Sequence, residues 1–307
     1  MRILFMGTPD IAAECLETLL KHKMTVVGAV SQPDKPKGRG HKMAPTDVKI
    51  KAMDAGIPVF QPEKIKSGEL VEVLEELRPD LIAVVAYGKI LPKYVLDYPK
   101  YGCINMHASL LPKLRGAAPI QWAVINGDKE TGVTTMLMDE GMDTGDILLS
   151  EKLEIGEYET SEELFLRIGK IGGELLAETI LNIETITPKK QQEEGATYAP
   201  MLTKEMGHIN WSESTDKISK LICGMNSWPL AYSFYKDDVV KIISAKKGEP
   251  SKGENGEILG FFKGKGLKVK TADGSMYIEE LQFPGSKKMP VEDYLRGHNI
   301  EIGTILK

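Results

Sequence analysis

The sequence predicts an α/β fold, a doubly wound and mainly parallel Rossmann-like sheet, followed by a small C-terminal β-barrel of the OB-like kind. Short, continuous apolar runs of strand length indicate parallel strands that helices cover on both faces. Helical stretches alternate with these runs, as in other α/β proteins. Beyond a polar stretch, the chain changes to short apolar runs separated by glycine-rich turns, which is typical of a small barrel.

The first elements are a strand, a turn and a helix. Residues 1–6 have a buried-strand pattern, and the turn Gly7–Asp10 follows. Pro9 suits the first turn of a helix, and the apolar residues Ile11, Leu16, Leu19 and Leu20 follow at helical spacing. We expect a helix at residues 68–77, and we expect the sheet to continue through further apolar runs at residues 25–30, 81–86, 102–106 and 133–138.

The second half of the chain divides into a long helix, a linker and the barrel. Thr160 and Glu163 form a capping box before a helix with apolar residues at Leu164, Ile168, Ile171 and Leu175. We expect a first domain over residues 1–187, a linker over 188–207 and a second domain over 208–307. The second domain should contain a helix and then strands, at residues 215–223, 239–243, 258–262, 267–269 and 276–281. Trp211 and Trp228 are expected to support the packing of this domain.

Composition restricts the class of protein. The chain has 307 residues, of which 42% are hydrophobic and 27% charged, values close to the globular average. No apolar run is long enough to span a bilayer, and the N-terminus does not resemble a signal peptide. Three widely spaced cysteines indicate neither a disulfide framework nor a zinc site, so we expect a cytoplasmic protein without a metal. The net charge is -5, yet residues 208–307 hold 15 Lys or Arg against 13 Asp or Glu.

Polar side chains follow the predicted strand at residues 102–106. Asn105 and His107 are two residues apart, so their side chains leave an extended segment on the same side. In open α/β sheets, ligands bind at the carboxyl ends of strands. A second polar turn at 139–146 follows the next strand, and its carboxylates could orient the histidine. Taken alone, His107 could be a structural hydrogen-bonding group, and the aspartates could simply form turns.

The spaced pattern Asn105-x-His107-x-Ser109-Leu110-Leu111-Pro112-x-x-x-Gly116, followed by Asp143, resembles the signature of the folate-dependent formyltransferases. Met106 departs slightly from this pattern, since valine is commoner there. Within this superfamily, five segments are similar to the members that act on methionyl-tRNA: GTPD at 7–10, QPDKPKGRG at 32–40, VVAYGKILP at 84–92, RGAAPIQWA at 115–123 and MDEGMDTGD at 138–146.

The resemblance implies a formyltransferase-type fold for residues 1–187 and a catalytic trio of Asn105, His107 and Asp143. The implied formyl donor is 10-formyltetrahydrofolate, without a metal, and the implied acceptor is initiator methionyl-tRNA. The chain is expected to act as a monomer. The residues expected to border the folate are Ser109, Leu110, Leu111, Pro112, Tyr87, Gly88, Ile90, Asp139 and Gly141.

Basic residues indicate where the tRNA would bind. The loop at 32–42 is rich in glycine, proline and basic residues, and the resemblance places it in the acceptor stem. Its expected contacts are Lys35, Lys37, Arg39 and Lys42, with Arg39 at the position that distinguishes initiator tRNA. Lysines throughout 208–307 could neutralise phosphates. Each set could also be ordinary solvated surface.

Other functions are possible on the sequence alone. A related formyltransferase could act on a sugar-nucleotide amine or on glycinamide ribonucleotide, and the same residues could instead hydrolyse the folate. The C-terminal domain argues against the ribonucleotide enzyme, and the basic loop favours tRNA over a sugar nucleotide. A dinucleotide-dependent oxidoreductase is disfavoured because Pro9 stands where the G-x-G-x-x-G pattern needs glycine. A noncatalytic tRNA-binding module would leave the trio without a purpose.

Overall fold

The computed structural model describes residues 1–37 and 42–307 and divides into two compact units. The first unit comprises residues 1–119, 131–154 and 165–199, and the second comprises 120–130, 155–164 and 200–307. The predicted domains, with limits at 187 and 208, were each one continuous segment. Each of these units instead consists of three separate segments of the chain. In the part of the chain that the structure describes, no helix is long and apolar enough to cross a membrane.

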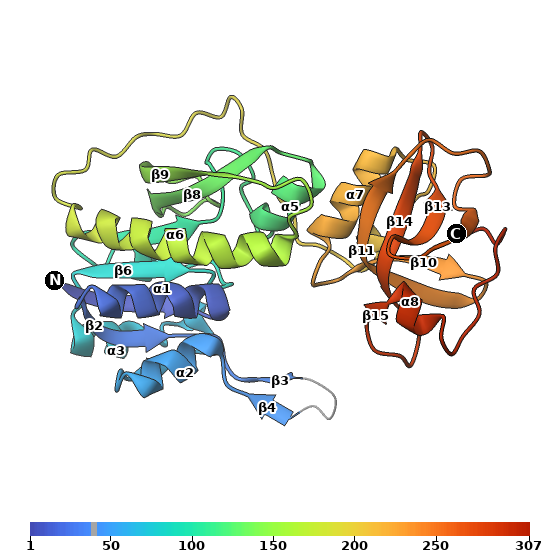
Figure 1. Ribbon diagram of the computed structural model, residues 1–307. Helices are drawn as coiled ribbons and strands as arrows, with labels where there is room; N and C mark the ends of the chain where they lie inside the picture. The colour runs from blue at the N-terminus through green and yellow to red at the C-terminus, as the bar shows by residue number, and fades with distance from the viewer. Residues whose placement is uncertain (38–41) are drawn as a thin grey trace. The chain divides into compact units, whose positions relative to one another are not determined.

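A seven-stranded sheet forms the centre of the first unit, in the order β5-β2-β1-β6-β7-β8-β9 (Figure 1). Its strands are β1 (Arg2–Gly7), β2 (Thr25–Val30), β5 (Val59–Phe60), β6 (Leu81–Val85), β7 (Cys103–His107), β8 (Glu130–Leu137) and β9 (Ile147–Glu154). The strands from β5 to β7 are parallel, which confirms the predicted doubly wound, mainly parallel sheet. β8 pairs antiparallel with β7, a reversal that the sequence pattern did not reveal.

The helices of the first half are α1 (Asp10–Lys21), α2 (Asp47–Asp54), α3 (Val71–Leu77), α4 (Lys93–Leu96), α5 (Pro119–Ile125) and α6 (Ser161–Leu181), with the 3-10 turn η1 (Ile65–Ser67). The capping box that begins α6 is confirmed: Thr160 N donates to Glu163 Oε2 at 2.8 Å, and Glu163 N donates to Thr160 Oγ1 at 3.2 Å. α6 lies close to α1, because a Cβ on Gly173 would come within 2.8 Å of Thr18 Oγ1.

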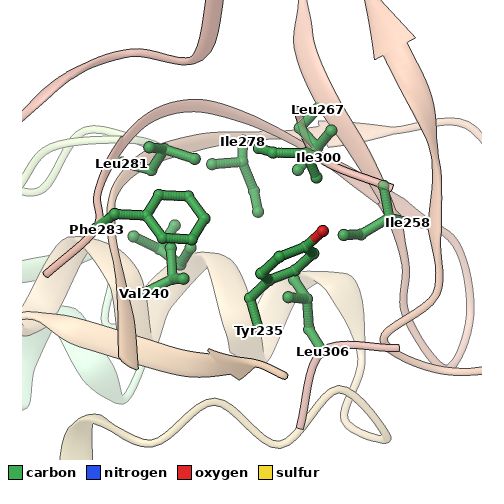
Figure 2. A pocket seen from close by; sticks show the side chains of 10 residues that line it. Tyr235, Val240, Ile258, Leu267, Ile278, Leu281, Phe283, Ile300 and Leu306 are labelled. Atoms are coloured by element: carbon green, nitrogen blue, oxygen red, sulfur yellow. The ribbon is translucent and has the colours of Figure 1, made fainter. Parts of the chain in front are cut away.

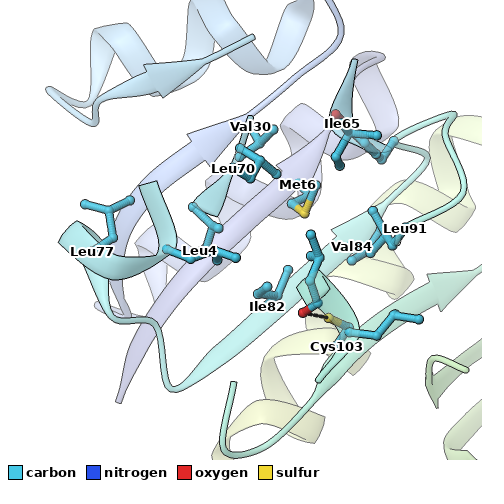
Figure 3. Close-up of a cluster of buried hydrophobic side chains, with 14 residues drawn as sticks. Leu4, Met6, Val30, Ile65, Leu70, Leu77, Ile82, Val84, Leu91 and Cys103 are labelled. Atoms are coloured by element: carbon cyan, nitrogen blue, oxygen red, sulfur yellow. Dashed lines mark hydrogen bonds between the residues drawn. The ribbon is translucent and has the colours of Figure 1, made fainter. Parts of the chain in front are cut away.

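An apolar cluster lies on the face of the sheet opposite α6. Leu4 and Met6 of β1 and Ile82 and Val84 of β6 pack there with apolar side chains of α3 and α4 (Figure 3). Cys103 of β7 belongs to the same cluster and lies on the same face. Because side chains alternate along a strand, β7 directs Cys103, Asn105 and His107 to this face and Met106 to the other.

The second unit is built around a six-stranded antiparallel sheet. Its main path is β10-β11-β14-β13-β12, and β15 pairs with β14. The elements are η2 (Glu205–Gly207), α7 (Thr215–Gly224), β10 (Ala231–Tyr235), β11 (Asp238–Gly248), β12 (Ile258–Phe262), β13 (Gly266–Lys270), β14 (Ser275–Gln282), β15 (Met289–Pro290) and α8 (Val291–Tyr294). The predicted helix and the four predicted strands of this region are confirmed, whereas β10, β15 and α8 were not predicted.

The C-terminal segment connects the two ends of this sheet path. Phe234 of β10 exchanges two backbone hydrogen bonds with Lys307, and Ile258 of β12 exchanges two with Gly303 and Thr304. These bonds complete the barrel that the glycine-rich pattern predicted. Apolar side chains fill its interior and leave a cavity of about 10 Å³, enough for one water at most (Figure 2). The barrel interior is therefore a packed core.

The two tryptophans of the second unit differ. Trp211 is buried and donates from Nε1 to Ser233 Oγ at 2.9 Å, which confirms its expected packing role. Trp228 is 56% exposed, so the expectation that it supports the packing of the barrel was wrong. It lies in the loop between α7 and β10, outside the regular strands whose alternation directs side chains inward.

We expect the three thiols to be unreactive in the folded protein. Cys15, Cys103 and Cys223 are all buried and unpaired. Burial raises the pKa of each thiol, that of Cys103 to about 12 with a contribution from Asp97. Since the thiolate is the nucleophile, iodoacetamide at pH 8 should alkylate the native chain at least tenfold more slowly than the guanidinium-denatured chain. Rapid labelling of one cysteine in the native protein would contradict the burial described here.

Candidate active site

Asn105 and His107 lie in the C-terminal half of β7. Asn105 pairs with Val84 of β6 and Met136 of β8, and His107 pairs with Thr134 of β8. Asn105 is 9% exposed and His107 is 5% exposed. Strands on both sides hold this segment, so the two side chains are fixed on one face of the sheet, as the spacing predicted.

The imidazole of His107 is held between a backbone carbonyl and a carboxylate. Its Nε2 lies 2.9 Å from Leu114 O, and its Nδ1 lies 3.7 Å from Asp143 Oδ2. A carbonyl oxygen only accepts hydrogen bonds, so Nε2 carries a hydrogen. Nδ1 is then the ring atom that can gain or lose a proton, and it faces Asp143. The 3.7 Å distance allows ion pairing but exceeds a direct hydrogen bond.

The loop that carries Asp143 returns across the sheet to reach His107. Since β8 is antiparallel to β7, the carboxyl end of β8 lies at the opposite end of β7 from His107. Asp143 has a left-handed backbone, with φ of +54°, which costs about 1 kcal/mol in a non-glycine residue. Its carboxylate accepts a hydrogen bond from Gly116 N at 2.8 Å. That backbone donor fixes the carboxylate beside the imidazole.

Asn105 supplies an amide beside this pair. Among the described residues, its side chain makes no hydrogen bond, and the residue is 9% exposed. An amide N–H in such a position can donate to an oxygen of a bound molecule without first breaking an internal bond. The site thus combines a neutral donor, an imidazole and a carboxylate.

Residues of the predicted linker also reach this site, which the sequence analysis missed. Gln191 donates from Nε2 to Asp143 O and Gly145 O, both at 2.8 Å. Thr197 Oγ1 accepts from Leu114 N at 2.8 Å. A Cβ at Gly116 would lie 2.7 Å from Ala199 O, so only glycine allows this close approach. These contacts join segments far apart in sequence, and the polar composition of the linker gave no periodic signal that could have revealed them.

The expected folate residues lie on three loops of the first unit. Gly88 and Ile90 are exposed beyond β6, whereas the Tyr87 side chain is buried in the apolar cluster. Ser109 is fully buried and donates to Lys113 O at 2.6 Å.

The remaining folate residues differ in their exposure. Leu111 is buried, whereas Leu110 and Pro112 are half-buried. Asp139 and Gly141 are exposed, and Asp139 Oδ1 accepts from Gly141 N and Thr144 Oγ1. The side chains of Ser109 and Tyr87 are therefore buried within the protein.

The expected tRNA loop is described only at its base. β3 (Lys35–Lys37) and β4 (Lys42–Ala44) pair antiparallel, with Lys37 opposite Lys42. Lys35 is exposed. Arg39 lies outside the described residues. The hairpin was not predicted, because its few residues show no apolar alternation.

Two family matches cover most of the chain. Residues 1–180 match the family described as "Formyl transferase", and residues 201–299 match "Formyl transferase, C-terminal domain". A methionyl-tRNA formyltransferase of Alkaliphilus oremlandii is 50% identical over 309 residues, which cover 100% of this chain and 99% of that protein. One from Clostridium novyi is 48% identical over 311 residues and covers 100% of each chain. The chain belongs to the methionyl-tRNA formyltransferase family. The resemblance inferred from the spaced motif is confirmed.

Solved structures with the same fold have much lower identity. HypX from Aquifex aeolicus, in complex with tetrahydrofolic acid, is 19% identical with a TM-score of 0.67, and the match covers 96% of this chain and 47% of HypX. An N-formyltransferase from Helicobacter canadensis, in complex with folinic acid and dTDP-3-aminofucose, is 20% identical with a TM-score of 0.66. That match covers 94% of this chain and 99% of the other. At such identities the likeness extends to the fold alone.

Proposed function

We propose that this member of the methionyl-tRNA formyltransferase family transfers the formyl group of 10-formyltetrahydrofolate to the amino group of methionyl initiator tRNA. The observation that carries the proposal is the full-length match to methionyl-tRNA formyltransferases at 48–50% identity. The geometry of Asn105, His107 and Asp143 supports it, because the reaction needs these three kinds of group around one carbonyl carbon.

The reaction begins when the amine attacks the formyl carbon. Negative charge then develops on the formyl oxygen, and the Asn105 amide stabilises it as an oxyanion-hole donor. The attacking nitrogen must lose a proton, which Nδ1 of His107 accepts. Asp143 stabilises the resulting imidazolium at 3.7 Å. The proton passes to N10 of the folate as the bond between N10 and the formyl carbon breaks, so the products are N-formylmethionyl-tRNA and tetrahydrofolate.

The loops around the trio fit a flat, partly apolar folate. Ile90 and Met142 are large apolar residues that are 62% and 60% exposed, on the loops that follow β6 and β8. Apolar side chains at the edges of a site can cover an aromatic ring system, while backbone groups satisfy its polar edge. We assign the donor to the side of the trio bordered by residues 86–90, 109–112 and 139–143.

The acceptor tRNA would meet basic residues in both units. In the first unit we assign Lys35, Lys37, Arg39 and Lys42 to the acceptor end. In the second unit, Lys268 and Lys270 are buried and bonded to Glu249 and to backbone carbonyls, so they are not phosphate ligands. Lys246 and Lys265 remain exposed beside Tyr277, where they line a groove of about 280 Å³.

We expect Lys246 and Lys265 to contribute to tRNA affinity. Replacing both with alanine removes two positive charges, so KM for methionyl-tRNA should rise about three- to tenfold while kcat stays constant. The slope of log KM against log salt concentration should become shallower by about 1 to 2. The exposed Lys252 does not line the groove, and Lys252→Ala serves as the control. An unchanged salt slope in the double variant would remove this groove from the tRNA interface.

A comparison of acceptors tests the proposed function. The protein is incubated with 10-formyltetrahydrofolate and, separately, with charged initiator tRNA, charged elongator tRNA or a 4-amino sugar nucleotide, and N-formylation is followed. We expect formylation of the initiator tRNA, with much weaker use of the elongator tRNA. Product only with the sugar nucleotide would instead establish a sugar formyltransferase. We also propose a cytoplasmic monomer, which ultracentrifugation and cell fractionation can check.

A further inference from the structure

We propose that Gln191 is a positioning residue that fixes Asp143 against His107. It lies in the segment between the two family matches, outside both. Its side-chain amide donates one hydrogen to Asp143 O and one to Gly145 O, each at 2.8 Å. A single side chain thus bonds both ends of the left-handed turn that carries the carboxylate.

Buried Arg115 holds Gln191 in this orientation. The guanidinium donates to Gln191 Oε1 from Nη2 at 2.9 Å and from Nε at 3.1 Å. Arg115 is 1% exposed, and its Nη1 forms an ion pair with Glu193 at 3.0 Å. Since arginine only donates, the oxygen of the Gln191 amide must face it. The NH₂ group of the same amide must therefore face the Asp143 turn.

The backbone of the same segment is tied to its neighbours on both sides. Lys189 exchanges two backbone hydrogen bonds with Ile147 at the start of β9, both at 2.8 Å. Arg115 exchanges two with Thr197 and Ala199, also at 2.8 Å. Gln191 is therefore carried by a backbone that is anchored on either side of it.

The Asp143 turn requires such a support because of its direction and conformation. It crosses back from the far end of β8, and its left-handed backbone at Asp143 is less favourable than an extended one. Gly116 N fixes the carboxylate itself, but only the Gln191 amide bonds the carbonyls at 143 and 145 among the side chains that the structure describes. A shift of about 1 Å in a catalytic group can reduce a rate about 100-fold.

Gln191→Glu separates positioning from folding. The glutamate keeps an acceptor for Arg115, so the segment stays anchored, but it loses the two N–H donors and places charge against two carbonyl oxygens. We expect kcat to fall about 10- to 100-fold, with both KM values within twofold of wild type and an unchanged melting temperature. Hydrogen exchange in peptides covering 139–147 should become faster. Gln191→Met, which has similar length but neither the donors nor the acceptor for Arg115, should lower kcat to a similar extent and should also lower the melting temperature.

A substitution at the neighbouring Gln192 serves as the control, and results for Gln191→Glu are compared with those of the wild type. Gln192 is exposed, and Gln192→Glu should leave both kcat and exchange unchanged. Wild-type values for kcat and for hydrogen exchange in Gln191→Glu would overturn the inference. A Gln191→Glu protein with a lower melting temperature and raised KM values would also overturn it. The inference rests on the proposed function through the role of Asp143. If the wild type formylates no acceptor, that function fails, and exchange at 139–147 alone then decides whether Gln191 fixes the turn.

Discussion

Replacing His107 with alanine is expected to lower kcat for formyl transfer by roughly 10³-fold. In the proposed mechanism, the imidazole accepts the proton of the attacking amine, and its Nδ1 faces Asp143 at 3.7 Å. Without it, the intermediate must pass its proton to water. KM for both substrates should change little, because the ring is 5% exposed and offers a bound substrate little contact area.

Single-turnover formylation with saturating substrates measures this effect separately from binding. His22→Ala is the matched control, since His22 is exposed and pairs with Glu174 on the surface. Its kcat should equal that of the wild type. Thermal unfolding of the His107 variant shows whether the fold is retained. A folded His107→Ala protein with normal turnover would remove the histidine from the mechanism.

Replacing Asn105 with alanine is expected to lower kcat by roughly 10²- to 10³-fold, which corresponds to about 3 to 4 kcal/mol of transition-state stabilisation. The amide makes no hydrogen bond within the described part of the chain, so its loss should remove an interaction with substrate rather than one within the protein. Asn105→Asp should be at least as damaging, because a carboxylate would repel the developing oxyanion.

Separate measurement of kcat and KM tests whether Asn105 acts as an oxyanion donor. An oxyanion donor acts mainly in the transition state, so KM should stay within a few-fold of wild type. Asn126→Ala, at an exposed asparagine after α5, should leave turnover unchanged. A variant at Asn105 that raises KM while retaining kcat would show that the amide holds the ground-state substrate instead.

The sequence predicted the buried parallel strands best. β2 lies at the residues expected, and β1, β6 and β7 begin or end within one residue of the predicted limits. Their two faces are both covered by other elements, so almost every side chain in β6 and β7 is buried and the apolar run is continuous. The capping box of α6 and the amphipathic α7 were also predicted, because local sequence determines each of them.

Elements at the edges of the sheet were missed. Leu148 is the only buried residue of β9, and the strand includes the exposed, charged Glu151 and Lys152, so it lacks a long apolar run. α2 buries only Val48 and Ala52 against the rest of the unit. The sequence pattern also could not predict whether β8 is parallel or antiparallel to β7, because an apolar run is compatible with either direction. Pairing with β7 decides its orientation.

The side chains of the candidate site were predictable, whereas their supports were not. The two-residue spacing placed Asn105 and His107 on one face, and the family signature added Asp143. The groups that hold them are largely backbone atoms, such as Leu114 O and Gly116 N, which carry no residue-specific signal. Gln191 lies 48 residues beyond Asp143 in a polar segment, and only tertiary structure brings the two together.

The most direct test follows the formyl carbon itself. The wild-type protein is mixed with 10-formyltetrahydrofolate labelled at the formyl carbon and with methionyl initiator tRNA, and the ester bond to the tRNA is then hydrolysed. The account predicts that the label appears in N-formylmethionine in an amount equal to the tetrahydrofolate released. Recovery of the label as free formate, with no formylated methionine, would show that water is the acceptor and would contradict the assignment.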